Sequence, residues 1–220
     1  MSTNSAAAGR NEGAEMIKNA LILFVITLIA GILLGMVYQV TKEPIAQQEA
    51  LKVENANKAV FAEAASFGEE SVLDEAEKDR LLLSDEEFSG VNIDSVLEAY
   101  DASGALEGYV MQITSKGYGD EIVFSMGVDL EGELNGISLI SINETPGLGM
   151  NAEKVLVPQY SEEGLAASPD YSIVKDGSGK ANASDTAIEA ISGATITSKA
   201  VNRGVNAGLL YYSEILKGGH

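Results

Sequence analysis

The stretch ALILFVITLIAGILLGMVYQV, residues 20–40, decides the first part of the fold, because it lies within a segment, 19–41, that carries no charged side chain. As a helix this segment is roughly 34 Å long, enough to cross a hydrocarbon core of roughly 30 Å. A cleaved signal peptide has a shorter apolar core of about 7 to 15 residues and a small-residue cleavage site. No A-x-A pattern precedes Lys42, so the sequence predicts an uncleaved, single-pass membrane anchor.

The residues that flank this anchor indicate its orientation. Residues 1–18 hold two basic and two acidic side chains, and Lys42 follows the span. A short N-terminal segment before the anchor and a large domain after it are typical of a signal anchor, so we expect 1–18 in the cytoplasm and the domain outside the cell membrane. Gly31 and Gly35 form a G-x-x-x-G, which either admits a second helix or reflects how common Gly is in membrane helices.

The composition of the 220-residue chain excludes several kinds of chemistry. With 33 acidic and 14 basic residues the net charge is −19, which argues against binding nucleic acid, because phosphates are bound mainly by Lys and Arg. Cys is absent, so disulfides, iron–sulfur clusters and thiolate zinc sites are excluded. The single His, His220, cannot form a multi-His metal site. Function must rest on carboxylates, hydroxyls, backbone groups or a cofactor.

The chain beyond the anchor divides into a connecting region, 42–95, and a C-terminal domain, 96–220. Apolar spacing over 43–65 predicts a helix that leaves the membrane and continues into the domain. Residues 63–101 hold 13 acidic side chains against Lys78 and Arg80. We interpret this run as a solvated face or a loose connection, with a cation-attracting surface as the alternative.

Alternating apolar residues predict an antiparallel sheet in the C-terminal domain. Residues 96–101 and 106–115 are expected to pair across the turn 102–105, and 122–129 and 135–143 across 131–133. A looser stretch, 144–184, follows, in which YSIVK at 171–175 is a possible strand. From Thr195 to Lys217 the apolar spacing predicts a helix with one buried face. The fold class is therefore α+β, an antiparallel sheet with flanking helices behind a single membrane helix.

Three glycine-bearing loops interrupt this frame where a sheet protein can build a site: 116–121 (KGYGDE), 144–149 (ETPGLG) and 192–198 (SGATITS). Glycine permits close approach of the backbone to a ligand, but it also serves ordinary turns. The third loop clusters hydroxyls at the start of the last helix, where free N–H groups and the helix dipole favour a phosphate. The alternative is a helix cap, in which Ser192 or Thr195 accepts a backbone hydrogen bond.

The run SGATIT resembles the signature at which certain bacterial respiratory proteins carry covalent FMN, with the phosphate esterified to threonine. ETPGLG, the GYG loop and the single N-terminal span are also similar to that family. Its members are the FMN-binding proteins known as the G subunit of Rnf-type ferredoxin:NAD electron-transport complexes and the C subunit of Na⁺-translocating NADH:quinone reductases. The resemblance covers the anchor and roughly residues 96–216, and the compact length is closer to the Rnf protein.

This resemblance implies specific site residues. Thr195 would carry FMN through a phosphoester, with Thr197 as the second possible acceptor, and Glu189 stands where the family pattern often has Asp. The turn before Thr195 and the loop that would line the flavin supply the other expected residues: Ser192, Gly193, Ala194, Glu144, Thr145, Gly147, Leu148 and Gly149.

The resemblance also implies a function, an electron relay within an ion-translocating oxidoreductase complex, and three kinds of partner: the other membrane and peripheral subunits, the membrane, and a flavin transferase. A transferase is expected because a threonine hydroxyl is a poor nucleophile without a base, and no His lies nearby in the sequence. Two alternatives stay open: the C subunit of a Na⁺-translocating NADH:quinone reductase, and an anchored sensory module that binds flavin without relaying electrons. A carboxylate hydrolase is disfavoured because no motif pairs the acidic residues.

Overall fold

The computed structural model describes residues 5–71, 73–83, 86–175 and 186–218. Contacts between residues divide the chain into two compact units, 1–51 and 52–220. The second unit takes in residues 52–95 together with the C-terminal domain expected at 96–220.

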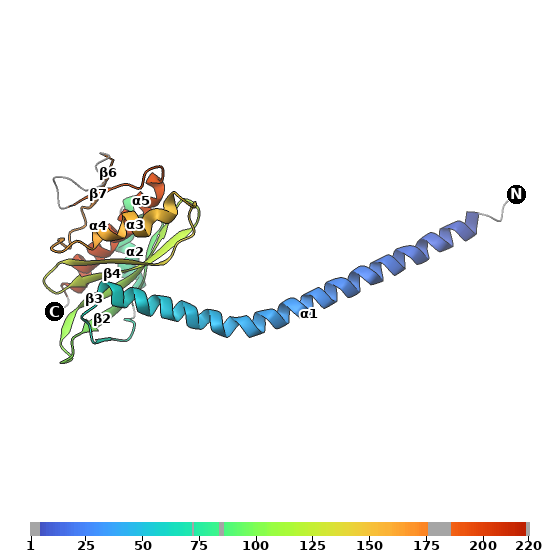
Figure 1. The fold of residues 1–220 in the computed structure, drawn as a ribbon, viewed down its shortest axis with the longest axis horizontal. Helices are drawn as coiled ribbons and strands as arrows, with labels where there is room; N and C mark the ends of the chain where they lie inside the picture. Colours follow the sequence, from blue (N-terminus) through green and yellow to red (C-terminus); the bar gives the residue numbers. More distant parts are fainter. Residues whose placement is uncertain (1–4, 72, 84–85, 176–185, 219–220) are drawn as a thin grey trace. The chain divides into compact units, whose positions relative to one another are not determined.

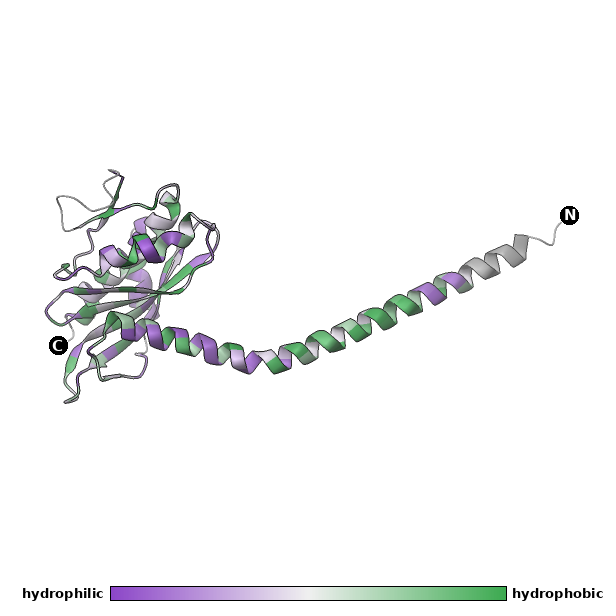
Figure 2. Cartoon of the chain, viewed as in Figure 1, coloured by the Kyte–Doolittle hydropathy of each residue, from purple (hydrophilic) through white to green (hydrophobic). Residues whose placement is uncertain are grey.

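The first unit belongs to helix α1, Ser5–Val60, which continues into the second unit and contains Pro44. Its apolar part is long enough to cross a membrane, and the most apolar stretch has no buried residue. Figure 2 shows this stretch as a run of hydrophobic residues between more hydrophilic turns. The expected span, 19–41, lies wholly inside the helix. The continuation predicted over 43–65 is helical only as far as Val60, where α1 ends.

A five-stranded antiparallel sheet forms the frame of the second unit, with its strands in chain order (Figure 1). Its two expected hairpins are confirmed: Val96 pairs with Met111, and Met126 pairs with Ile137. A third pairing joins the middle strands across the GYG loop, with Lys116 opposite Glu121. The strands are β1 Ser66–Phe67, β2 Val91–Tyr100, β3 Leu106–Lys116, β4 Glu121–Asp129 and β5 Leu134–Ser141.

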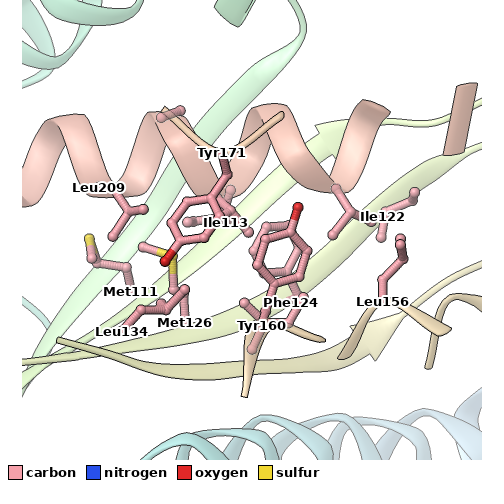
Figure 3. Packing of buried hydrophobic residues seen from close by; sticks show 14 of the residues in the cluster. Met111, Ile113, Ile122, Phe124, Met126, Leu134, Leu156, Tyr160, Tyr171 and Leu209 are labelled. Atoms are coloured by element: carbon pink, nitrogen blue, oxygen red, sulfur yellow. The ribbon is translucent and has the colours of Figure 1, made fainter. Parts of the chain in front are cut away.

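One face of the sheet is covered by helices (Figure 1). The expected C-terminal helix is α5, Thr195–Tyr211, followed by a π-helical turn, η3, Tyr212–Leu216. Side chains from α5 and from the sheet form the main core, which Figure 3 shows around Phe124, Met126 and Tyr160. Burial of this apolar surface is the main force that holds α5 on the sheet.

The other face of the sheet carries a smaller core. Val60, the last residue of α1, and Phe61, which follows it, pack there against Ala99 and Val110. Close to them, Ser125 Oγ donates a hydrogen bond of 2.6 Å to Asn57 Oδ1, and both residues are buried. The last turns of α1 are therefore part of the second unit.

Two expectations about residues 63–101 are corrected. The second strand begins at Val91 rather than at Val96, and the expected loose connection contains regular elements, including α2, Glu75–Leu82, and the short η1, Glu86–Phe88. Asp74 caps α2 by accepting hydrogen bonds from the N–H groups of Ala76 and Glu77. The acidic side chains of α2 are exposed, so the run is a solvated face on an ordered element.

The stretch 144–184 is also more regular than expected wherever the structure describes it. It contains η2 Gly149–Asn151, α3 Ala152–Val155, α4 Val157–Tyr160 and β6 Ser172–Val174. The last of these confirms the possible strand in YSIVK. It pairs with β7, Ala187–Glu189, in a separate parallel two-stranded sheet, which the sequence did not indicate. The remainder of this stretch, 176–184, lies outside the described residues.

Candidate functional site

The three glycine-bearing loops meet at one end of the large sheet. The 117–120 loop joins β3 to β4 at this end. Val123, near the start of β4, pairs with Ser141, the last residue of β5, so the loop after β5 also begins there. Two hydrogen bonds tie α5 to this end of the sheet. Ser115 Oγ donates to Ala200 O at 2.7 Å in the core, and Arg203 Nη2 donates to Lys116 O at 3.0 Å at the surface. The fold therefore brings together loops whose residues lie up to 82 positions apart in sequence, from 116 to 198.

Glu144 joins all three loops through its buried carboxylate. Its Oε1 accepts hydrogen bonds from the N–H groups of Tyr118 at 2.7 Å and Gly119 at 3.2 Å. Its Oε2 accepts one from Thr197 Oγ1 at 3.2 Å. Only 6% of the Glu144 surface is exposed.

The turn that leads into α5 is held from inside the helix. Ser198 Oγ accepts a hydrogen bond from Ile191 N at 2.9 Å and donates one to Ala194 O at 3.0 Å. Ala194 occupies the N-cap position and provides no side-chain cap. The capping role considered for Ser192 or Thr195 is therefore wrong, because Ser198 ties the turn in its place. The N–H groups of the first helical residues, 195–197, precede the first i→i−4 bond, from Ser198 N to Ala194 O.

The loop that follows β5 contains a Pro-Gly turn. Leu148 N donates to Thr145 O at 3.1 Å across Pro146 and Gly147, and the φ of Gly147 is +76°. Proline and a positive-φ glycine at the two central positions are typical of a type II turn. The positive φ of Gly147 thus serves the turn, which directs the chain back toward α5.

A cavity of about 540 Å³ lies between these loops, within the range of about 300–1,000 Å³ usual for small-molecule sites. The Leu148 and Ile196 side chains on its rim are 40% and 53% exposed, an arrangement suited to a planar apolar ligand. The lining residues are Tyr118, Glu144, Thr145, Leu148, Gly149, Gly193, Ala194, Thr195, Ile196 and Thr197.

The charge around the cavity is low. Glu144 is the one lining residue with a carboxylate, and no Lys or Arg of the described chain lines the cavity. A phosphate bound here would be stabilised mainly by the N–H groups and dipole at the start of α5. Nearby, the pKa of exposed Asp120 is lowered because the Glu121 N–H and the Asn143 amide donate hydrogen bonds to its carboxylate.

The structure brings most of the residues predicted for the site to this cavity. Eight of the ten line it, whereas Ser192 is exposed and outside the lining, and Gly147 shapes the turn behind it. Sequence reasoning counted Ile196 only among the apolar residues on the buried face of the C-terminal helix, whereas the structure leaves it 53% exposed and in the cavity lining. It also named the loop of Tyr118 without singling out that residue. An aromatic residue between two glycines, as in GYG, was the sequence signal that could have identified Tyr118 as a lining residue.

Comparisons with known protein families agree with this arrangement. Residues 117–210 match the FMN-binding domain family, and residues 7–60 match the RnfG N-terminal region. The first match includes all three site loops, and the second covers α1 from residue 7 to its end.

Two curated relatives are similar over most of the chain. The G subunit of the Na⁺-translocating ferredoxin:NAD⁺ oxidoreductase complex of Acetobacterium woodii is 33% identical over 203 residues, covering 91% of this chain and 93% of the relative. The G subunit of the proton-translocating ferredoxin:NAD⁺ oxidoreductase complex of Clostridium ljungdahlii is 32% identical over 184 residues, covering 83% and 84%.

Among solved structures, NqrC of Shewanella oneidensis matches 54% of this chain and 57% of its own, with a TM-score of 0.41 and 23% identity. The C subunit of the Na⁺-translocating NADH-quinone reductase of Parabacteroides distasonis matches 57% and 64%, with a TM-score of 0.45 and 24% identity. The matched part is less than two thirds of either solved chain.

Proposed function

Because the chain belongs to the family of G subunits of ion-translocating ferredoxin:NAD⁺ oxidoreductase complexes, we propose that it is the membrane-anchored, FMN-carrying member of such an Rnf complex. In this role it relays electrons between other subunits and does not turn over a substrate alone. Bound FMN supplies the one- and two-electron chemistry that side chains lack. The chain itself binds the cofactor, orients it and holds it at the membrane.

The residues of the cavity fit FMN in three respects. The volume is adequate, the rim is apolar, and the start of α5 presents N–H groups that can bind a phosphate. The absence of basic side chains among the described lining residues suits a phosphodiester, which keeps a single negative charge.

The hydroxyl groups near the start of α5 differ in their availability, and this difference carries the assignment of the attachment site. Thr197 is 2% exposed and donates to Glu144, and Ser198 is fully buried with two hydrogen bonds. Ser192 lies outside the cavity lining. Thr195 is half-buried and lines the cavity at the first helical position, and its side-chain hydroxyl has no hydrogen-bond partner among the described residues. Thr195 is therefore the acceptor of the FMN phosphoester.

Attachment requires a flavin transferase. Deprotonating a threonine hydroxyl needs a general base. The cavity carboxylate, Glu144, already accepts hydrogen bonds from two backbone N–H groups and from Thr197. The base and the activated FMN donor are therefore supplied by the enzyme that attaches the cofactor.

The anchor places this relay at the cell membrane, with residues 1–18 in the cytoplasm and the FMN domain outside. In that compartment covalent attachment has a physical advantage, since a dissociated FMN could not be replaced from the cytoplasmic pool. The high coverage of the two Rnf-type relatives favours an Rnf complex over a Na⁺-translocating NADH:quinone reductase. Purification of the chain alone with reversibly bound flavin would instead favour the sensory module.

The attachment site is tested with two substitutions in the full-length chain, co-produced with its flavin transferase. Thr195→Val keeps the shape of the side chain but removes the hydroxyl, so in-gel flavin fluorescence after denaturation should disappear. Thr195→Ser restores a hydroxyl and should recover part of the fluorescence. Fluorescence of undiminished intensity in Thr195→Val would contradict the assignment, and mapping the modified peptide would then identify the true acceptor.

A further inference from the structure

The carboxylate of Glu144 is bonded to groups of the chain itself, on the two other loops that form the cavity. Both carboxylate oxygens are engaged by donors of the chain itself, the N–H groups of Tyr118 and Gly119 on one side and the hydroxyl of Thr197 on the other. These donors lie 25 to 53 residues away in sequence, on the loop between β3 and β4 and on the first turn of α5. The ETPGLG loop thus contributes the acceptor that ties the other two loops to it.

The packing around this carboxylate leaves no room for side chains at the neighbouring glycines. A Cβ atom on Gly117 would overlap Glu144 Oε1. A Cβ atom on Gly149 would lie 2.6 Å from Thr197 Oγ1 and 2.7 Å from Glu144 Cβ. Two of the three loops therefore need glycine so that their backbones can approach the Glu144 side chain.

We infer that Glu144 is a positioning residue, whose carboxylate latches the 117–120 loop and the first turn of α5 to the ETPGLG loop. The bond to Thr197 fixes the helical turn that also carries Thr195. The bonds to Tyr118 and Gly119 fix the opposite wall of the cavity. This inference rests on the proposed function for its consequence, the geometry in which Thr195 is presented, but the latch itself is a property of the chain without flavin.

A carboxylate suits this role for two reasons. Hydrogen bonds to an ionised acceptor are about twice as strong as those between neutral groups. Since the acceptor is buried, removing it would leave two backbone N–H groups and one hydroxyl without a partner, the costly situation for polar groups shielded from water. Glutamine can replace most of this pattern, because its amide oxygen accepts from Tyr118 and Gly119 while its amide nitrogen donates to Thr197 Oγ1.

The test compares Glu144→Ala, Glu144→Gln and Glu144→Asp in the full-length chain with wild type. Ser125→Ala is the matched control, because it removes a buried hydrogen bond, to Asn57, outside the cavity. The first readout is hydrogen exchange of the Tyr118 and Gly119 amides, measured on the flavin-free chain made without the transferase. The second is the fraction of folded protein that carries FMN, from intact mass, when the transferase is co-produced.

In Glu144→Ala, exchange at Tyr118 and Gly119 should rise by about tenfold or more, the effect of losing one ordinary hydrogen bond, and the FMN-loaded fraction should fall several-fold. Glu144→Gln should keep both near wild type. Ser125→Ala should lower the melting temperature without changing either. If Glu144→Ala does not fold, Glu144→Asp decides, since its shorter side chain cannot reach both sets of donors and should show the same two changes.

Two results would overturn the latch: unchanged exchange at Tyr118 and Gly119 in Glu144→Ala or Glu144→Asp, or a loss of FMN in Glu144→Gln as large as in Glu144→Ala. A wild-type chain that never carries covalent FMN would overturn the proposed function instead. The exchange measurement would still decide the latch in that case, because it uses the flavin-free chain.

Discussion

Thr195 and Thr197 show how neighbouring residues of one type acquire different roles. They are two positions apart in a helix, so their side chains point to different sides. Thr197 points into the protein and is 2% exposed, whereas Thr195 is half-buried at the cavity. The residue that resemblance favours as the FMN acceptor is also the one whose hydroxyl is available.

Because Gly149 lies so close to Thr197 of α5, we expect a side chain at position 149 to destabilise the fold. In Gly149→Ala the new methyl group would overlap Thr197 Oγ1, so we expect a loss of about 1–3 kcal/mol in the free energy of unfolding, as in other overpacked sites. The loaded FMN fraction should fall as well, because the first turn of α5 is displaced. Urea titration and intact mass measure the two effects.

Gly147→Ala provides the comparison. A Cβ atom at Gly147 would meet nothing within 4 Å, so the substitution only strains a backbone with a φ of +76°, at a cost of about 1 kcal/mol. FMN loading should stay close to wild type. Equal loss of loading in both variants would show that closeness to Thr197 is not what matters.

The turn of the β2–β3 hairpin is held by hydrogen bonds to a single carboxylate, that of Asp101. Asp101 accepts hydrogen bonds from the Ser103 hydroxyl and from the N–H groups of Ala105 and Ser103, and these bonds lower the pKa of Asp101 below its ordinary value of 3.8. Because the folded state favours the ionised form, this stabilisation is present above the ordinary pKa and is lost as the pH falls through the lowered pKa.

This linkage predicts a pH effect for Asp101→Asn. The melting temperature of the wild type should fall more steeply than that of the variant between about pH 5 and about pH 3, since the variant has no carboxylate to protonate at this turn. Between pH 7 and 8 the two curves should run parallel. A fall of the same steepness in both proteins below pH 5 would mean that the turn contributes nothing to acid sensitivity.

The elements that sequence analysis predicted are those with a repeating local pattern. Alternation of Tyr109, Met111 and Ile113 identified β3, and all three are buried in the main core. The apolar spacing after Thr195 identified α5. By contrast, α3 and α4 have four residues each, too few for a helical period to show, and they are held by packing against distant residues.

For the candidate site, the sequence indicated the segments that take part but not the bonds between them. Glycine loops and clustered hydroxyls singled out three segments that could build a site, and residues of all three line the cavity. The bonding of Glu144 could not be predicted, because a carboxylate in a loop is normally solvated, and only the fold shows that its donors lie on two other segments. The capping role of Ser192 or Thr195 was wrong for the same reason, since Ser198 reaches back from within the helix.

At the scale of the whole chain, charge and hydropathy are segregated. Residues 1–18 hold equal numbers of acidic and basic side chains and 19–41 hold none, so the entire net charge of −19 lies beyond the span. Much of it lies within 63–101, where α2 exposes its acidic side chains, whereas the cavity lining has one carboxylate. Acidity therefore belongs to the outer surface of the domain and not to the proposed cofactor site.

The proposed orientation can be tested because the natural chain contains no Cys. Ala102→Cys places a single thiol on the exposed turn between β2 and β3, and Ala14→Cys places one before the span. In spheroplasts, a membrane-impermeant maleimide should label the first variant at once and the second only after lysis. The reverse pattern would place the FMN domain in the cytoplasm.

Covalent FMN on Thr195 can be measured as the intact mass of the denatured protein purified from cells that contain its transferase. We expect a mass above that of the polypeptide by one FMN less one water, and no such increment in Thr195→Val. A wild-type mass equal to that of the bare polypeptide, or an increment that persists in Thr195→Val, would contradict it.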